Sequence, residues 1–312
     1  MIQRDDVLAA ERRIREHIRR TPLLRGGSAS APLWLKCEFL QHTGVFKARG
    51  AFNRQLAALE RGELDPAVGV VAASGGNAGL ANAYAAASLG VPATVFVPEN
   101  APRIKVERLL AYNANVRQTG AEYIEAYEAA QEFVVQSGAL FCHAYDQPEI
   151  AAGAGTIAEE ILQDEPGIDT IVVAVGGGGL YAGLAAAAAG RAKIVTVEPF
   201  SIPTLHAALQ AGRPVDVSVS GIAADSLGAR RVGDIAFSTA SQNPPISVLV
   251  NDDAIIAARR QLWSEYRIPA EYGAATAFAA LTSGAYLAEE DERVAVIICG
   301  ANTDPCTLDA TP

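Results

Sequence analysis

Cysteine, histidine and basic runs are scarce in this 312-residue sequence, and each shortage excludes a class of protein. Four cysteines without a C-x-x-C pair are too few for a disulfide scaffold and fit a reducing cytoplasm. Four scattered histidines lack the spacing of metal ligands. The net charge is −10 and Lys and Arg form no run, so a nucleic-acid partner is not expected.

Long apolar segments and several familiar motifs are also missing. The N-terminus has no apolar signal core, and the alanine-rich segments are too short or too interrupted to cross a membrane. Neither the G-x-S-x-G elbow nor the G-x-x-x-x-G-K-[ST] loop occurs. Because half of the residues are hydrophobic and only 19% are charged, we expect a soluble, cytoplasmic globular protein without membrane contact.

What the sequence does contain is a regular alternation of strand-like and helix-like segments. Apolar runs at 68–73, 93–97 and 170–175 are each followed by a turn and a helical stretch. The alternation repeats about every 24 residues and favours right-handed βαβ crossovers. It predicts an α/β fold with two lobes that share a cleft, each lobe a mostly parallel sheet flanked by helices.

The boundaries of several helices can be predicted from their patterns. Apolar residues at helical spacing predict a helix over 5–20, before Thr21-Pro22. A second helix is predicted over 47–61, closed by Gly62, and a third over 156–162.

Lys47 stands in unusual surroundings, between Phe46 and small or apolar neighbours at the start of a predicted helix. Because lysine is almost never fully buried, the ordinary interpretation is a solvated side chain whose stem lies on apolar surface. The alternative is a lysine whose pKa is lowered by desolvation and by the positive helix N-terminus. Such an amine can form a Schiff base with a carbonyl cofactor. The local sequence leaves both interpretations open.

Three polar or glycine-rich turns follow predicted strands, at 74–77, 176–179 and 299–302. In open α/β sheets, ligands gather at the carboxyl ends of strands. The first two turns run directly into helices, whose free N–H groups and dipole suit an anion. Glycine lets a phosphate approach the backbone closely. Together with the lysine, these turns favour a ligand site over simple tight connections.

A dinucleotide fingerprint is the main rival interpretation of the second turn. Gly177-x-Gly179-x-x-Ala182 matches its permissive form, and Glu198 lies about 20 residues further on, at the end of the next strand. This arrangement would suit an NAD-dependent dehydrogenase. Against it, the fingerprint usually opens the first βα turn, whereas here it lies in the middle of the chain. It also leaves Lys47 without a role.

The residues from Glu38 to Ala51 (EFLQHTGVFKARGA) resemble the cofactor-lysine motif of serine/threonine dehydratases. These are pyridoxal-5′-phosphate (PLP) enzymes of the tryptophan-synthase-β fold, called fold type II. The runs SGGNAG at 74–79, GGGGL at 176–180 and CGAN at 299–302 fall in the family's order and spacing. The resemblance extends over essentially the whole chain.

The resemblance implies a role for each of these residues. Lys47 would be the Schiff-base lysine and, once displaced by substrate, the base that removes the Cα proton. Phe46 would pack against the pyridine ring, and Asn77 would hydrogen-bond its hydroxyl. Cys299 matches the position that contacts the pyridine nitrogen, where a neutral partner should leave that nitrogen unprotonated. The phosphate would bind to Gly176, Gly177, Gly178, Gly179 and Leu180, and the substrate carboxylate to Ser74, Gly75, Gly76, Asn77 and Ala78.

The resemblance further implies a large domain over 1–60 and 149–312 and a small domain over 61–148 that closes over the substrate. It also implies a homodimer, which is the commonest assembly of soluble proteins. The implied reaction is β-elimination, which converts L-threonine or L-serine into a 2-oxo acid and ammonia. Other activities of the same fold stay open: serine racemase, hydroxyaspartate dehydratase, action on phenylserine-like or ectoine-derived substrates, or a β-replacement synthase. A protein that binds PLP without turnover is a further alternative.

The sequence departs from the family at several places. Val45 stands where serine is common, and EYGA at 271–274 replaces the family's Glu-Pro-Gly-Gly. Gly75 occupies the position of the racemases' second base, which argues against racemisation. Relatives that bind a divalent cation have a glutamate that Glu198 matches, but Thr204 replaces their aspartate. We therefore expect no metal ion, with Glu198 as the one weak candidate ligand. Too few residues follow Asn302 for us to expect an allosteric domain.

Overall fold

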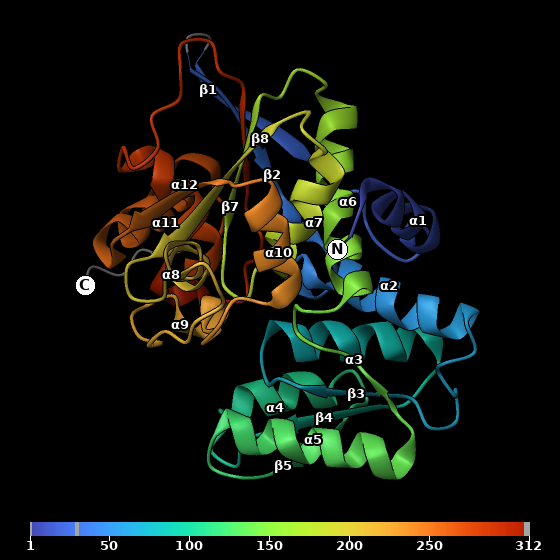
Figure 1. Ribbon diagram of the computed structural model, residues 1–312. Helices are drawn as coiled ribbons and strands as arrows, with labels where there is room; N and C mark the ends of the chain where they lie inside the picture. The colour runs from blue at the N-terminus through green and yellow to red at the C-terminus, as the bar shows by residue number, and fades with distance from the viewer. Residues whose placement is uncertain (1, 29–30, 309–312) are drawn as a thin grey trace.

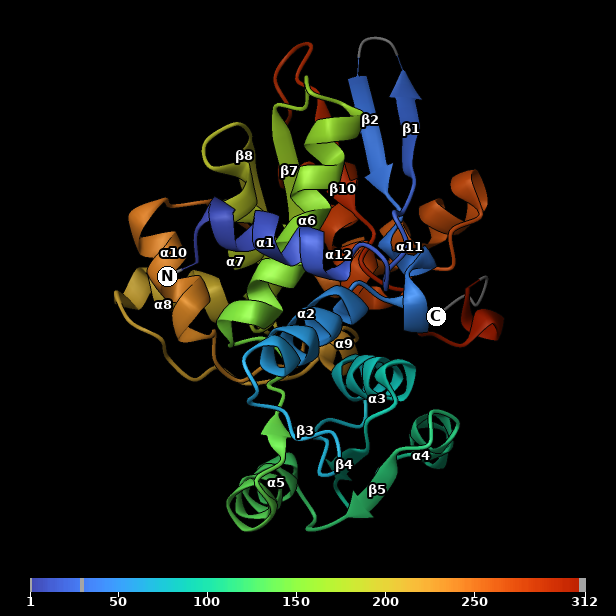
Figure 2. The same ribbon diagram turned by 90° about the vertical axis from the view of Figure 1, so that its right-hand side faces the viewer.

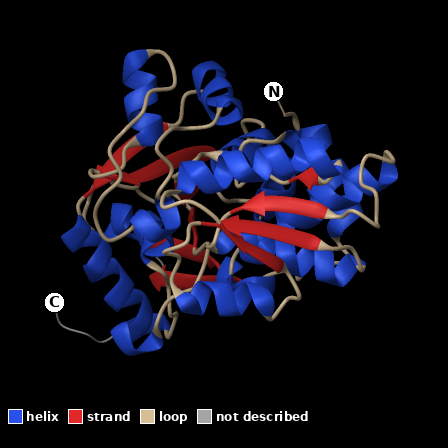
Figure 3. Ribbon diagram, turned by 90° about the horizontal axis from the view of Figure 1, so that it is seen from below, coloured by secondary structure: helices blue, strands red, loops and turns tan. Residues whose placement is uncertain are grey.

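Two β-sheets divide the chain into two lobes in the computed structural model, which describes residues 2–28 and 31–308 (Figure 1). The larger sheet has the strand order β1-β2-β10-β7-β8-β9, and the smaller one β5-β4-β3-β6. All strand pairs are parallel except β1 with β2. Strands of both sheets lie inside and helices outside (Figure 3). The predicted α/β architecture of mostly parallel sheets flanked by helices is confirmed.

The strands of the larger sheet are β1 (Leu23–Ser28), β2 (Ala31–Lys36), β7 (Thr170–Ala174), β8 (Lys193–Pro199), β9 (Ile246–Val250) and β10 (Val294–Ile297). The helices around it are α1 (Arg4–Ile14), α2 (Lys47–Glu60), α6 (Pro148–Asp164), α7 (Gly179–Ala188), α8 (Thr204–Ala211), α9 (Ala224–Leu227), α10 (Asp234–Gln242), α11 (Asp252–Tyr266) and α12 (Tyr272–Thr282).

The smaller lobe contains β3 (Val70–Ala73), β4 (Ala93–Val97), β5 (Asn115–Gln118) and β6 (Leu140–Phe141), with α3 (Asn77–Leu89), α4 (Arg103–Leu110) and α5 (Tyr123–Ser137). Short 3-10 turns cover Glu38–Leu40, His42–Gly44 and Pro305–Thr307. None of the helices in the described parts of the chain is long and apolar enough to span a membrane.

Two helices differ from the sequence prediction. Helix α1 ends at Ile14 rather than near residue 20, because the chain turns there and Ile18 packs against the cluster around Phe52. Helix α6 begins at Pro148 rather than near residue 156. Gly153 and Gly155 lie inside α6 and weaken the helical pattern of that segment, yet Gly is tolerated in a helix where close packing requires it.

Helix α2 lies between the lobes and contacts α6 on one side and α3 on the other (Figures 1 and 2). Glycines bring the helices of the larger lobe unusually close. A Cβ atom on Gly153 of α6 would lie 2.6 Å from the carbonyl oxygen of Arg49 in α2, and one on Gly183 of α7 would lie 2.1 Å from that of Ala151 in α6. Since real Cβ atoms do not approach so closely, no other residue fits at either position without moving a helix.

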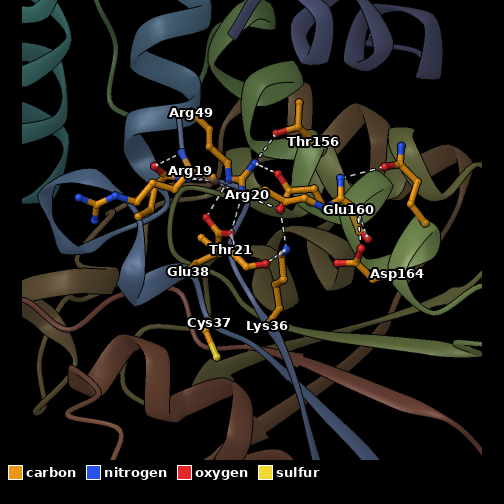
Figure 4. A network of polar contacts seen from close by, with 12 residues as sticks. Arg19, Arg20, Thr21, Lys36, Cys37, Glu38, Arg49, Thr156, Glu160 and Asp164 are labelled. Carbon is orange, nitrogen blue, oxygen red and sulfur yellow. Dashed lines mark hydrogen bonds and ion pairs between the residues drawn. The ribbon is translucent and has the colours of Figure 1, made fainter. Parts of the chain in front are cut away.

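A buried charged cluster lies beneath the first turn of α2 (Figure 4). The Arg49 guanidinium is fully buried and donates to both oxygens of Glu38 at 2.8 Å and to both oxygens of Glu160 at 2.7 and 2.9 Å. Lys36 Nζ donates to Glu160 at 2.5 Å and to the carbonyl of Thr21 at 2.7 Å. Two cations thus face two carboxylates, and the cluster ties β2, α2 and α6 together.

The charges in this cluster depend on one another. Burial alone would lower the pKa of Arg49, but Glu38 and Glu160 raise it above its ordinary value. Burial alone would raise the pKa of Glu160, but Arg49 and Lys36 hold it below the ordinary value. Arg49 and Glu160 therefore stay ionised because their partners are in place.

Substitution of Glu160 by Gln is expected to lower the free energy of unfolding by roughly 3–5 kcal/mol, because it leaves a buried cation without its partner. Urea denaturation of the full chain measures the change. The control is Glu107→Gln, which breaks an exposed ion pair with Arg103 and should cost less than about 1 kcal/mol. Equal losses in both variants would contradict a structural role for the buried cluster.

Candidate active site

Lys47 lies in a cavity where the two lobes meet. The larger lobe contributes Phe46, Gly179 and Leu180 to its lining, and the smaller lobe contributes Ala78. The Nζ atom of Lys47 donates to the carbonyl of Ala144 at 3.1 Å and lies 4.8 Å from the centre of the Phe46 ring.

Burial lowers the pKa of Lys47, while Cys299 and Glu271 act in the opposite direction. The residue is also the first of α2, where the helix dipole disfavours a positive charge. The structure therefore favours the second interpretation of this lysine, an amine that loses its proton more readily than a solvated one. A neutral amine is a nucleophile and a base.

A short antiparallel bridge between Val45 and Gly300 places Cys299 beside Lys47. The backbone N–H of Phe46 donates to the Cys299 carbonyl at 3.0 Å. Burial, and then the charge of Glu271, raise the pKa of the Cys299 thiol. The thiol therefore stays protonated and is a neutral group near the lysine.

The side chain of Asn77, at the start of α3, is fixed by two partners. Its Nδ2 donates to both oxygens of Glu271, at 3.0 and 3.1 Å, and its Oδ1 accepts from Asn302 Nδ2 at 2.7 Å. Asn302 also donates to the carbonyl of Thr43 at 3.0 Å. Because that carbonyl can only accept, the chain of contacts sets the orientation of both amides.

Glu271 belongs to the site, although sequence reasoning treated it only as part of a departure from the family pattern. It is 6% exposed. Burial raises its pKa to about 7, against the opposing effects of the Asn77 hydrogen bond and the Lys47 charge. Its side chain is brought to Asn77 across 194 residues of sequence, so no local pattern could reveal the contact.

The glycine turn after β7 provides backbone N–H groups at the start of α7. Gly178 has a φ of 87°, a left-handed conformation that favours glycine, and it offers α7 no side-chain cap. A Cβ on Gly177 would lie 2.3 Å from the Tyr145 ring, and one on Gly179 would lie 2.3 Å from the Tyr145 carbonyl. The first N–H groups of a helix have no partner inside it. Such a cradle suits a phosphate.

The turn after β3 brings a second helix N-terminus to the site. Gly76 precedes α3 and provides no side-chain cap. Ser74 Oγ accepts from the Gly76 N–H at 3.3 Å, and Gly75 lies between them. Since Ala78 of α3 and Gly179 of α7 line the same cavity, two positive helix ends from different lobes converge near Lys47.

The dinucleotide interpretation is wrong on the position of its acidic residue. Glu198 is fully buried and accepts from the N–H groups of Leu205 and His206, each at 2.8 Å. It therefore caps α8 and cannot reach a ribose. Within residues 2–28 and 31–308, no three His, Cys, Asp or Glu side chains form a group that could hold a metal ion.

The residues around Lys47 fit PLP: an amine of lowered pKa for its carbonyl, a protonated thiol, and a glycine cradle for its phosphate. Over residues 14–300 the sequence matches the family described as pyridoxal-phosphate dependent enzymes. The chain is 37% identical to the L-threonine ammonia-lyase of Geobacter sulfurreducens over 306 residues, which are 96% of this chain and 75% of that protein.

Solved structures agree with this similarity. Threonine deaminase isoform 2 of Solanum lycopersicum superposes with a TM-score of 0.90 at 30% identity and covers 98% of this chain and 85% of its own. Serine racemase of Dictyostelium discoideum superposes with a TM-score of 0.87 at 30% identity, over 97% of this chain and 99% of its own. The chain therefore belongs to the pyridoxal-phosphate-dependent enzymes of fold type II, in the serine/threonine dehydratase family.

Proposed function

We propose that the protein is an ammonia-lyase that converts a small β-hydroxy amino acid, L-threonine or L-serine, into a 2-oxo acid and ammonia. One observation carries the proposal: Lys47, with its lowered pKa, lies where the helix N-termini of α3 and α7 converge. The combination provides a base and two anion sites, as an amino acid substrate and a phosphorylated cofactor require. The threonine ammonia-lyase and threonine deaminase among its relatives support the same reaction class.

When bound, PLP supplies an electron sink for the electron pair left at Cα of the substrate. The protein's own residues hold the cofactor and orient it and the substrate. We assign the phosphate to the N–H groups of 176–180, the ring face to Phe46, the ring hydroxyl to Asn77 and the ring nitrogen to Cys299. A protonated thiol at that nitrogen carries no negative charge, so it does not draw a proton onto the ring.

Lys47 has two tasks in the proposed reaction. Its neutral Nζ atom would hold the cofactor at the cofactor's carbonyl carbon, and once freed it would accept the proton from Cα of the substrate. Both tasks require an unprotonated amine, which the lowered pKa favours. The carbonyl of Ala144, which accepts from Nζ, holds the amine in place.

The substrate carboxylate is assigned to the start of α3, with Ser74, Gly75, Gly76, Asn77 and Ala78. An N–H cluster at a helix N-terminus binds a carboxylate as it binds a phosphate.

We also propose that residues 61–148 form a small domain that closes over the substrate. All four strands of the smaller sheet lie between residues 70 and 141, which supports this division. A cytoplasmic homodimer is proposed as the working form.

Racemisation of serine is the second candidate, because a serine racemase is among the structural relatives. Gly75 carries no side chain that could act as a base on the face opposite Lys47. With L-serine, we therefore expect pyruvate and ammonia to accumulate and D-serine not to accumulate. Chiral chromatography of the reaction mixture separates the two outcomes.

Replacing Lys47 by Ala is expected to lower the rate of threonine deamination by at least about 10²–10⁴-fold, because the base is lost. It should also abolish covalent attachment of the cofactor, which is seen by mass spectrometry after borohydride reduction. The control is Lys193→Ala, at a half-exposed residue that pairs with Glu292 and does not line the cavity. Wild-type deamination by the Lys47 variant would overturn the proposal.

Replacing Glu271 by Gln is expected to shift the pH midpoint of cofactor attachment to lower pH. The sign follows from the charges: ionised Glu271 raises the pKa of Lys47, so a neutral side chain lets the amine lose its proton at lower pH. The attachment rate is measured as visible absorbance against pH. Glu159→Gln removes a buried carboxyl that pairs with Arg4 and Arg191 instead. A shift in both variants, or in neither, would contradict the coupling.

A further inference from the structure

Three carbonyls of the glycine turn after β7, those of Gly176, Gly177 and Gly178, each accept a hydrogen bond from a different donor. The Gly176 carbonyl accepts from the Thr204 hydroxyl at 2.5 Å. The Gly177 carbonyl accepts from the Gly233 N–H at 2.9 Å, and the Gly178 carbonyl from the Ala182 N–H at 2.9 Å. Two of these donors are backbone groups, and the first is a side chain.

The three contacts determine where the N–H groups of the turn point. In a planar trans peptide, the carbonyl of one residue and the N–H of the next point in opposite directions, and none of the described peptide bonds is cis. Holding the Gly176 carbonyl therefore turns the N–H of Gly177 away from Thr204. The other two contacts likewise turn the N–H groups of Gly178 and Gly179 away from the Gly233 and Ala182 donors.

Thr204 can hold the Gly176 carbonyl because it is itself held in place. It is fully buried at the start of α8, and its Oγ1 lies 2.9 Å from Oε1 of Glu198. Glu198 in turn accepts from the N–H groups of Leu205 and His206. The carboxyl thus fixes both the hydroxyl and the first turn of α8 at the end of β8.

Counting protons assigns the direction of these hydrogen bonds. A hydroxyl carries one hydrogen, and the Gly176 carbonyl can only accept, so the Thr204 hydrogen lies toward Gly176. The same hydroxyl lies within hydrogen-bond distance of Glu198 Oε1, which is its second acceptor. Burial raises the pKa of Glu198 to about 7, against the opposing hydrogen bonds from the backbone and from the Thr204 hydroxyl. The adjacent strands β7 (TIVVA) and β9 (ISVLV) carry no charged residue.

We propose that Thr204, held by Glu198, is a positioning residue that aims the Gly177 N–H at the phosphate of the cofactor. Phosphate recognition then depends on a hydroxyl that lies 28 residues from the turn it orients. This inference rests on the proposed binding of the PLP phosphate at 176–180, and the experiment below separates the two.

The test compares the affinity of the full-length apoprotein for PLP and for pyridoxal, which has the same carbonyl and ring but no phosphate. Thr204→Val keeps the shape and removes the hydroxyl, so PLP affinity should fall about tenfold while pyridoxal affinity stays unchanged. Thr204→Ser restores a hydroxyl and should restore most of the preference for PLP. The matched control is Thr276→Val, which removes a fully buried hydroxyl that donates to the Tyr272 carbonyl in α12 at 2.9 Å.

Each outcome distinguishes among the assignments. A Thr204→Val protein that keeps the wild-type preference for PLP over pyridoxal would overturn the role of Thr204 and leave the cofactor site standing. Equal losses of both affinities, with a lower melting temperature, would reduce Thr204 to a general structural role and overturn the proposal as well. Wild-type protein that binds PLP no tighter than pyridoxal would overturn the phosphate site and this inference with it. Thr204→Ala provides the same comparison should the valine variant not fold.

Discussion

The buried guanidinium of Arg49 is the constraint on which the site depends. A charge without exposure to water is stable only when it is paired on all sides, and here Glu38 and Glu160 accept its hydrogen bonds in the fork-like geometry that a guanidinium provides. One partner precedes α2 and the other belongs to α6. The requirement to satisfy this one residue therefore sets the position of the first turn of α2, and with it the direction of the Lys47 side chain two residues earlier.

Local motifs were the part of the site that the sequence could predict. Lys47 and the three turns could be proposed as a site because each lies in a short run of neighbouring residues, such as a glycine turn before a helix. The partners that hold these residues could not be identified. Glu271 reaches Asn77 across 194 residues and Asn302 reaches it across 225, and no spacing rule links positions so far apart.

The fold could be predicted for a similar reason, and the errors in that prediction have physical causes. Alternating apolar runs and helices predicted parallel strands such as β3, β4 and β7 because their periodicity is local. The hairpin strand β1 was missed because it contains Gly26 and Gly27, which weaken a strand pattern. For Glu198 the error is of the opposite kind: its spacing matches the dinucleotide fingerprint, but the residue does not have the role that the fingerprint predicts. The residue lies where a ribose ligand is expected in sequence, but its side chain turns inward to cap α8.

The close contacts at Gly153 and Gly183 have a consequence for how the sequence can vary. At Lys47 the proposed chemistry requires an amine. At these glycines every side chain is excluded by the neighbouring backbone, whatever its polarity. A saturation-mutagenesis scan would therefore contain a second set of invariant positions, on the packed faces of α6 and α7. Substitutions there are not tolerated because the helix axes lie so close together. A map of essential residues would therefore overstate the extent of the catalytic machinery unless the glycine positions were interpreted separately from Lys47.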